Sequence, residues 1–252
     1  MKKKVLLLML LPLLLSCANG GRGFPSDYFS SEDRFKGEEY ITFNDKNENG
    51  TLYDPSNGYA NSGNFLSYWS RKSLSINNGM AEMSLHDDED GKNYGAEIRT
   101  RQGFLYGYFG GRMKPFKKSG TVQSIFTYNG GRYAWDEIDI EFLGKDTTKV
   151  QFNYYHNGQG GHEYLYELGF DAAEDFHDYG FLWEENHITW YVDSFPVYRV
   201  DASLPQWGFF YCNVWAGKTD DLTTRLWLGD YSKDNEKHIA YYDKLYYSPI
   251  DA

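Results

Sequence analysis

Cysteine is scarce in this chain of 252 residues, which contains only Cys17 and Cys212. Because Cys17 lies in an N-terminal targeting segment, the mature domain would keep one thiol and could not form an internal disulfide. Positive charge is also in short supply, since 25 Lys and Arg face 36 Asp and Glu and the formal net charge is −11. A field of that sign repels phosphate backbones and anionic membranes, so the composition argues against nucleic acid and anionic lipid as partners.

No apolar run in the sequence is long enough to anchor it in a bilayer. Three lysines at the N-terminus precede an apolar stretch over residues 5–15, which is the pattern of an export signal. This stretch ends in Leu-Leu-Ser-Cys17, which resembles a bacterial lipobox; ordinary secretion with an incidental cysteine is the alternative. We expect a lipoprotein-type signal peptide over residues 1–17, a flexible tether over residues 18–28, and export to the periplasm or the cell surface.

Helical periodicity is scarce as well. The best helix candidate is the short segment 171–177, and no internal repeat or break in composition divides the chain. Alternating polarity instead predicts half-buried strands over 80–85 and 187–193. The second strand would be followed by a turn over 194–196 and a returning strand over 197–200.

Asn-Gly pairs recur along the chain and are a strong short-range signal for hairpins. They begin at Asn49, Asn57, Asn78, Asn129 and Asn157. Many hairpins imply an antiparallel sheet, so we expect one all-β sandwich domain over residues 29–252. Aromatic residues, 19% of the chain, suit both pleated strands and wet sugar-binding clefts, and composition alone does not separate these explanations.

The most informative segment is 135–142, in which Glu137, Asp139 and Glu141 alternate with apolar residues. Residues two apart share a face of a strand, so the three carboxylates would project together while the apolar residues enter a core. Neighbouring carboxylates repel one another and suit a strand poorly, which argues for a chemical role. A solvated acidic face is the structural alternative, but the β-branched and aromatic opposite face speaks against it.

Two kinds of site use such a row of carboxylates. Hard cations bind clustered carboxylates, but calcium sites usually take oxygens from an irregular loop, and a straight strand cannot wrap an ion. Retaining glycoside hydrolysis needs two carboxyl groups about 5–5.5 Å apart, one as nucleophile and one as acid and then base. Residues four apart on a flat strand start roughly 13 Å apart at Cα, so we expect a concave sheet that brings Glu137 and Glu141 together. Asp139 between them could hold one glutamate ionised and raise the pKa of the other, and spacing alone does not assign the two roles.

The segment 137–147, with its continuation through 150–155 and 161–163, resembles the bacterial lichenases, which are endo-β-1,3-1,4-glucanases of glycoside hydrolase family 16. The resemblance covers nearly the whole mature chain, from about residue 59 to residue 243. The motif lacks the extra bulge residue of the laminarinase branch and so is also similar to plant xyloglucan transglycosylases. The Lys-Asp-Thr-Thr-Lys continuation favours lichenase.

This resemblance implies a curved, concanavalin-like β-jelly-roll with an open cleft and a role for each acidic residue. Glu137 corresponds to the nucleophile, Glu141 to the general acid/base, and Asp139 to the residue that assists them. The implied reaction is endo-hydrolysis of mixed-linkage β-glucan at β-1,4 bonds next to 3-linked glucose. The remaining alternatives are a xyloglucan-active hydrolase or transglycosylase, a laminarinase-like glucanase, and a non-catalytic lectin on the same fold.

The resemblance also implies sugar-contacting residues, and they are of the kinds that stack on sugar rings or bind hydroxyl groups. They are Asn61, Glu97, Arg99, Phe126, Tyr128, Trp135, Asn153, Tyr155, Asn213, Trp215 and Trp227. Core packing is the alternative for each single aromatic residue, above all for Trp215.

Several family features are absent or changed in this sequence. The frequent family disulfide would join positions near Ser67 and Gly95, neither of which is cysteine. Catalysis requires no cofactor by this resemblance, and a structural calcium ion would be held by Asp243 and the carbonyl of Gly79. The six histidines show no metal-ligand spacing. We expect a monomer whose partner is a β-glucan polysaccharide.

Lipidation at Cys17 can be tested by palmitate labelling in a bacterial host. We expect label in the wild-type protein and none in Cys17→Ala, because the thiol is the attachment point. The control Cys212→Ala leaves the first thiol in place and should keep the label. Equal labelling of Cys17→Ala and wild type would show that the lipobox-like run is incidental.

Overall fold

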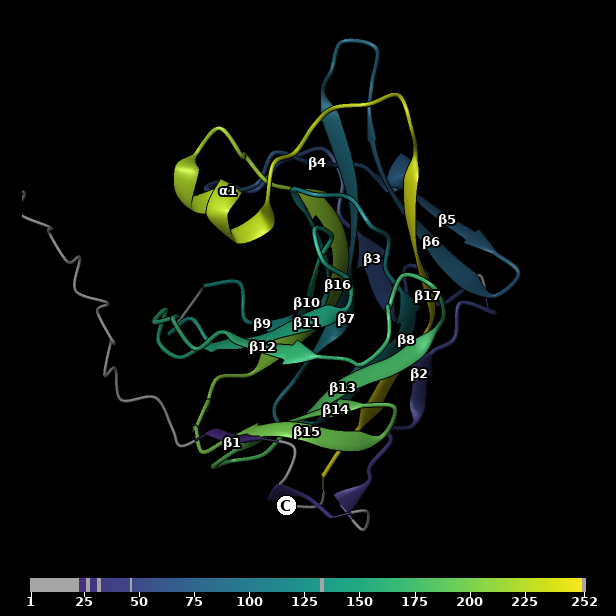
Figure 1. The fold of residues 1–252 in the computed structure, drawn as a ribbon. Coiled ribbons are helices and arrows are strands. Elements are labelled where there is room, and N and C mark those ends of the chain that lie inside the picture. The colour runs from purple at the N-terminus through teal and green to yellow at the C-terminus, as the bar shows by residue number, and fades with distance from the viewer. Residues whose placement is uncertain (1–22, 26–27, 31–32, 46, 132–133, 251–252) are drawn as a thin grey trace, which may run out of the picture.

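The computed structural model describes residues 23–25, 28–30, 33–45, 47–131 and 134–250. Its strands form two curved sheets packed face to face, almost wholly antiparallel, which confirms the expected all-β jelly-roll architecture (Figure 1). The predicted signal peptide and Cys17 lie outside the described residues. Within the described part, no helix combines the length and apolar character needed to span a membrane.

The outer sheet contains both ends of the described chain. Its strands, in order across the sheet, are β1 (Gly23–Pro25), β15 (Phe195–Val200), β14 (Ile188–Val192), β13 (His177–Trp183), β8 (Gly107–Lys114), β17 (His238–Ser248), β6 (Met80–Asp87) and β5 (Leu74–Asn77). The short strand β2 (Glu39–Ile41) also pairs with β17. β1 falls inside the segment expected to be a tether, where its backbone pairs with the edge of β15.

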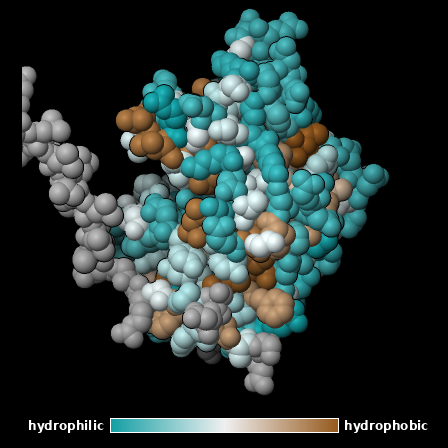
Figure 2. All heavy atoms as spheres, viewed as in Figure 1, coloured by the Kyte–Doolittle hydropathy of each residue, from teal (hydrophilic) through white to brown (hydrophobic). Residues whose placement is uncertain are grey.

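The inner sheet carries the acidic motif near its centre. Its strands, in order, are β12 (Tyr164–Glu167), β11 (Lys149–Tyr155), β10 (Glu137–Leu143), β9 (Thr121–Tyr128), β16 (Gly208–Ala216), β7 (Asn93–Phe104) and β3 (Tyr53–Pro55). β4 (Tyr68–Trp69) pairs in parallel with the start of β7, after which the 3₁₀ helix Arg71–Ser73 leads into β5. The helix α1 (Leu222–Leu228) follows β16 and lies beside the inner sheet, where Figure 2 shows a hydrophobic group on an otherwise mostly hydrophilic face.

The apolar face of β10 anchors the acidic motif in the core between the sheets. Ile138, Ile140 and Phe142 are at most 1% exposed, as the alternation predicts. Phe142 meets Tyr179 of β13 edge to face, with the ring centroids 4.7 Å apart. Burial of each such side chain stabilises the fold by roughly 1.5–3 kcal/mol, so the strand is held firmly by the face opposite the carboxylates.

The helix expected over 171–177 is wrong. This segment is a series of turns in which the Asp171 carboxylate accepts hydrogen bonds from Ala173 N (3.1 Å) and Thr147 Oγ1 (2.5 Å). Aspartate often bonds to nearby backbone and thereby competes with helix formation. The helix that does form, α1, has Asp221 as its N-cap, with the carboxylate accepting from Thr224 N at 2.8 Å.

The expected hairpin after 187–193 forms, but two details differ. The turn is centred on Asp193 and Ser194, whose φ angles are 48° and 70°, so β15 already begins at Phe195. β14 is also buried on both faces rather than one, because its second face is covered: Tyr191 packs against Tyr108 at 5.8 Å between ring centroids.

Ser67 and Gly95, where the resemblance places a disulfide, lie side by side. A Cβ added to Gly95 would be 3.2 Å from Ser67 Cβ and would clash with the Val214 carbonyl oxygen, so this position requires glycine here. Ser67 Oγ instead accepts a hydrogen bond from Ala216 N at 2.7 Å and donates one to Asn93. Hydrogen bonds thus connect the segment at Ser67 to β16 and β7, and the backbone at Gly95 leaves no room for a disulfide.

Candidate active site

The acidic motif lies in three parallel rows of side chains that run across the strands of the inner sheet. The strand register, read from β11 towards β7, gives a polar row of Gln151, Glu141, Ser124, Asn213 and Glu97. The middle row contains Asn153, Asp139, Phe126, Tyr211 and Arg99. The third contains Tyr155, Glu137, Tyr128 and Phe209. A long ligand lying along these rows would pass directly over the carboxylates.

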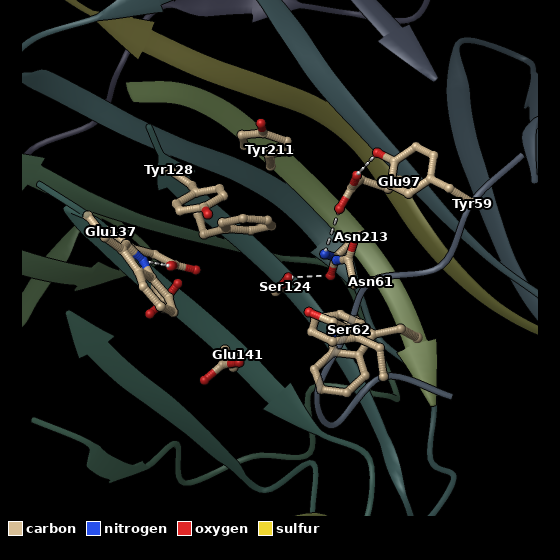
Figure 3. Close-up of a pocket in the computed structure, with 15 residues that line it drawn as sticks. Tyr59, Asn61, Ser62, Glu97, Ser124, Tyr128, Glu137, Glu141, Tyr211 and Asn213 are labelled. Atoms are coloured by element: carbon tan, nitrogen blue, oxygen red, sulfur yellow. Dashed lines mark hydrogen bonds between the residues drawn. The ribbon is translucent and has the colours of Figure 1, made fainter. Parts of the chain in front are cut away.

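A cleft covers the rows and consists of two adjoining hollows. The hollow towards β16 has a volume of about 390 Å³ and the one towards β11 about 530 Å³, and both are lined by the three carboxylates, Trp135 and Trp215. Figure 3 shows Glu137 and Glu141 projecting from β10 into the first hollow, with Glu97 and Asn213 across from them. These volumes fall in the range of ligand sites.

Glu137 is held by two hydrogen-bond donors. Trp135 Nε1 donates to Glu137 Oε2 at 2.6 Å, and the Asp139 carboxyl group donates a second hydrogen bond to Glu137. Burial raises the pKa of Glu137 to about 7, while both donors act in the opposite direction because they stabilise the ionised form. Burial, and then the charges of Glu137 and Glu141, raise the pKa of Asp139 well above its usual value, and its hydrogen bond to Glu137 acts in the same direction.

Glu141 has a different environment. Burial, together with the negative charges of Glu137 and Glu163, raises its pKa to about 8, against a single hydrogen bond from Gln151 that lowers it. Gln151 Nε2 donates to Glu141 Oε2 at 2.6 Å, and Trp227 Nε1 donates to Gln151 Oε1 at 3.2 Å. Of the two glutamates, Glu141 therefore holds its proton to the higher pH.

Trp135 presents a flat ring beside the carboxylates. Its indole is 38% exposed and stacks on Tyr155 with centroids 4.9 Å apart and planes 10° apart. The neighbouring Asp136 is buried and accepts hydrogen bonds from Asn157 N (3.0 Å) and Gln206 N (3.2 Å). These bonds tie together three loops and hold the ring over the cleft, where it could stack on a sugar.

The end of the cleft towards β7 contains a buried polar network. Ser124 Oγ donates to Asn213 Oδ1 at 2.6 Å, Asn213 Nδ2 donates to Glu97 Oε2 at 3.3 Å, and Ser56 Oγ donates to Glu97 Oε1 at 2.6 Å. Burial raises the pKa of Glu97 despite these donors. At the rim, Asn61 Oδ1 accepts from Trp69 Nε1 at 3.1 Å. This end offers fixed hydrogen-bonding groups to a sugar.

The structure brings together nearly all residues that the sequence singled out. Around the carboxylates, the cleft is lined by Asn61, Glu97, Phe126, Tyr128, Trp135, Asn153, Tyr155, Asn213, Trp215 and Trp227. Arg99 lines an adjacent pocket that shares Tyr59 and Tyr211 with the cleft. Trp215 is only 4% exposed and stacks on Phe65 at 3.9 Å, so its ring also serves the core.

Sequence reasoning missed several residues that line the cleft. Ser124, Gln151 and Tyr211 each lie two residues from a predicted site residue on the same strand, so the alternation could have found them. The others come mainly from loops or from α1: Tyr59, Ser62, Asn64, Phe65, Glu163 and Thr223. Local alternation carries no information about that second group.

The two residues implied as calcium ligands lie near each other in the register. β17 pairs Tyr242 with Ala81, which brings Asp243 towards the turn at Gly79. Carboxylate and carbonyl oxygens are ligand types that calcium prefers, although Asp243 Oδ2 also lies 3.6 Å from Arg112 Nε. The described residues contain no group of three or more His, Cys, Asp or Glu side chains that could hold a metal ion.

The raised pKa of Glu141 predicts a pH-dependent cost to the stability of the fold. Its pKa is 4.5 in an unfolded chain and about 8 in the native state, so ionisation destabilises the native state progressively as pH rises between those values. We expect Glu141→Gln to raise the free energy of unfolding at pH 8 by about 1–2 kcal/mol, with a smaller gain towards pH 5. Denaturant unfolding measures this, with the exposed Glu236→Gln as control. A gain that does not depend on pH would contradict the prediction.

Comparison with known proteins places the chain in a family. Residues 61–243 match Glycosyl hydrolases family 16. The chain is 40% identical to a beta-glucanase of Bacillus licheniformis over 234 residues, which cover 91% of each chain. It is 45% identical to a xylanase/beta-glucanase of Ruminococcus flavefaciens and to a beta-glucanase of Acetivibrio thermocellus, but it spans only 26% and 57% of their lengths.

Solved structures agree with this placement. The structure of Bacillus licheniformis beta-glucanase matches with a TM-score of 0.79 and 40% identity, over 85% of this chain and 99% of that one. A prokaryotic beta-1,3-1,4-glucanase (lichenase) from a mouse hindgut metagenome matches with a TM-score of 0.74 and 41% identity, over 91% of this chain and 99% of that one. The chain with the acidic strand β10 at the base of its cleft therefore belongs to glycosyl hydrolases family 16.

Proposed function

We propose that the chain is a retaining endo-hydrolase of mixed-linkage β-1,3-1,4-glucan that cleaves β-1,4 bonds next to 3-linked glucose. The observation that carries this proposal is the unequal environment of the two outer carboxylates on β10. Glu137 receives hydrogen bonds from Trp135 and Asp139, whereas Glu141 receives one from Gln151 and keeps its proton to higher pH. Two carboxyl groups with separated tasks are what the retaining mechanism needs.

In the first step, Glu137 attacks the anomeric carbon and the glycosidic bond breaks. Glu141 gives its proton to the departing oxygen, so the leaving chain departs as a neutral alcohol and the sugar remains as an ester on Glu137. The hydrogen bond that Asp139 donates to Glu137 stabilises the ionised carboxylate of Glu137 before it attacks. Burial of Glu141 supplies the raised pKa that a general acid requires near neutral pH.

In the second step, the ionised Glu141 takes a proton from water. The water oxygen attacks the anomeric carbon from the side that the leaving chain vacated, and the bond to Glu137 breaks. Two displacements at the same carbon leave the product with the β configuration of the substrate.

Endo cleavage is supported by the shape of the site. The three rows of side chains continue on both sides of β10. All three reach β11 in one direction and cross β9 to β16 in the other, and two of them extend to β7. A polymer can therefore extend past the carboxylates at both ends. The name of the matched hindgut protein, a beta-1,3-1,4-glucanase, supports the choice of polymer.

Export and anchoring through Cys17 are further proposals, supported by the lipobox-like sequence. A structural calcium ion at Asp243 and Gly79 is likewise a proposal, supported by their neighbouring positions in the register of β17 and β6. Neither takes part in the bond-breaking steps.

The substrate proposal predicts a specific product pattern. Barley β-glucan should lose viscosity rapidly and yield mainly tri- and tetrasaccharides, because the bond cleaved must follow a 3-linked glucose. Laminarin, carboxymethylcellulose and xyloglucan are the comparison substrates, with products separated by chromatography. Faster hydrolysis of laminarin or xyloglucan than of barley β-glucan would refute the proposed specificity.

The roles of the two glutamates predict opposite anomers in azide rescue of the inactive variants. In Glu137→Ala, azide enters the vacated space and displaces an activated aryl leaving group once, so an α-glycosyl azide should form. In Glu141→Ala, the glycosyl-enzyme still forms from such a substrate and azide intercepts it, so the product should be the β-glycosyl azide. The proton coupling constant at the anomeric carbon distinguishes the two.

Other outcomes of this experiment are equally informative. Exchanged products would reverse the two roles, and α-azide from both variants would exclude the retaining mechanism. Gln206→Ala, which alters a side chain outside the cleft lining, should retain activity on the aryl substrate without azide.

A further inference from the structure

Asp136 is a buried acidic residue that takes no part in the bond-breaking steps, although it stands between Trp135 and Glu137 in the chain. Its side chain is only 1% exposed. Among the basic side chains that the structure describes, only His156 comes within ion-pair distance of this carboxylate. Because a buried carboxylate is costly unless hydrogen bonds satisfy it, the donors to Asp136 show which segments it holds together.

The donors to Asp136 come from two loops, one after β11 and one before β16. Asn157 N donates to Asp136 Oδ1 at 3.0 Å, and the backbone N–H of Gln206 donates to Oδ2 at 3.2 Å. The third donor is His156, whose Nδ1 lies 3.2 Å from Oδ1. Asn157 Nδ2 donates to His156 Nε2 at 2.8 Å, so Nδ1 is the ring nitrogen that carries the hydrogen and donates it to Asp136.

The turn over residues 156–159 also holds Trp135. Asn157 and Gly158 have φ angles of 51° and 75°, as in the two-residue hairpin turns that Asn-Gly favours. Gly158 N donates to the Trp135 carbonyl oxygen at 2.7 Å. A Cβ added to Gly158 would lie 3.6 Å from Trp135 Cε3, so the turn is in contact with the indole. The turn that Asp136 binds is therefore the same turn that supports the Trp135 ring.

The position of the indole matters for the ionisation of Glu137. Burial raises the pKa of Glu137 to about 7, and the hydrogen bond from Trp135 Nε1 to Glu137 Oε2, at 2.6 Å, is the largest effect in the opposite direction. Hydrogen bonds weaken steeply when their geometry departs from the optimum, so a displaced ring would stabilise the carboxylate less. The other ionisable groups that interact with Glu137 are Asp139, Glu97, Tyr128 and Tyr155.

We propose that Asp136 and His156 form a positioning pair, which fixes the Trp135 N–H against Glu137 and thereby stabilises the carboxylate of the nucleophile. Neither residue lines the cleft, so the pair acts through Trp135 rather than on the substrate. This inference rests on the proposed function, because it concerns the nucleophile of the same reaction. Loss of either partner should loosen the turn, let the indole move and raise the pH at which Glu137 ionises.

Two simpler roles for the pair predict different results. If Asp136 acted only through its charge, its removal would favour ionisation of Glu137 and lower the pH at which it occurs. If the pair only stabilised the fold, the variants would unfold at lower denaturant concentration, but Glu137 would ionise as in the wild type. The direction of the change therefore separates the three roles.

The test measures kcat/KM against pH on an aryl β-glycoside of a mixed-linkage trisaccharide. An activated aryl group leaves without a proton, so the acid limb of the profile reports the ionisation of Glu137 in the free enzyme. Asp136→Asn and His156→Ala should each move this limb up by about 0.5–1 pH unit. The matched control is His177→Ala, which should leave the limb in place, because His177 Nδ1 makes a similar contact with Asp193 Oδ2, at 2.8 Å, on the outer sheet.

A second comparison tests whether the effect passes through the indole. Trp135→Phe keeps an aromatic ring but lacks the N–H donor, so it should move the limb up by itself. Asp136→Asn should then add little in the Trp135→Phe background, since residues that act through one contact are not additive. If Asp136→Asn does not fold, His156→Ala provides the same comparison, because its side chain is 41% exposed.

The outcomes separate this inference from the proposed function. No upward shift in the single variants, an equal shift in His177→Ala, or a full further shift on top of Trp135→Phe would overturn the positioning pair while leaving the proposed function intact. A wild-type protein that does not hydrolyse the substrate would refute the proposed function, and the positioning pair with it.

Discussion

The structure depends on keeping three carboxyl groups on one face of one strand. Their mutual repulsion and their burial both oppose ionisation. Hydrogen-bond donors, rather than positively charged side chains, offset this cost. A hydrogen bond with Asp139 stabilises the carboxylate of Glu137, Trp135 donates to the same carboxylate, and Gln151 donates to Glu141. The three carboxyl groups can therefore lie a few residues apart, in an arrangement that an isolated strand would not adopt.

The remainder of the fold supplies the stability that this arrangement lacks. The opposite face of β10 is buried to completion, and Trp190 Nε1 from the outer sheet donates to the Asp139 carbonyl oxygen at 3.0 Å. Contacts of its apolar face thus fix the position of the strand, while its other face carries three neighbouring carboxyl groups that repel one another when ionised. Such a division, with packing on one face and chemistry on the other, follows from the two-residue period of a strand.

The two ends of the cleft differ in character. Towards β7, buried Glu97, Asn213 and Ser124 form a closed network of hydrogen bonds, which can discriminate among hydroxyl positions. Towards α1, the surface becomes apolar and exposed, with Leu165 and Leu226 at its edge.

The sequence by itself determined the strand character of the chain, the common face of Glu137, Asp139 and Glu141, and the buried face behind them, because alternation is a local property. It did not determine α1, a helix of two turns in which Leu222 and Leu226 are exposed and only Thr224 and Leu228 are buried, nor the burial of β14 on both faces. Only the tertiary structure decided which strands are neighbours, and hence that Gln151 lies opposite Glu141 and that Leu165 extends the same row. Register arises from pairing between distant segments, and loop residues such as Phe65 reach the cleft only once those segments have packed.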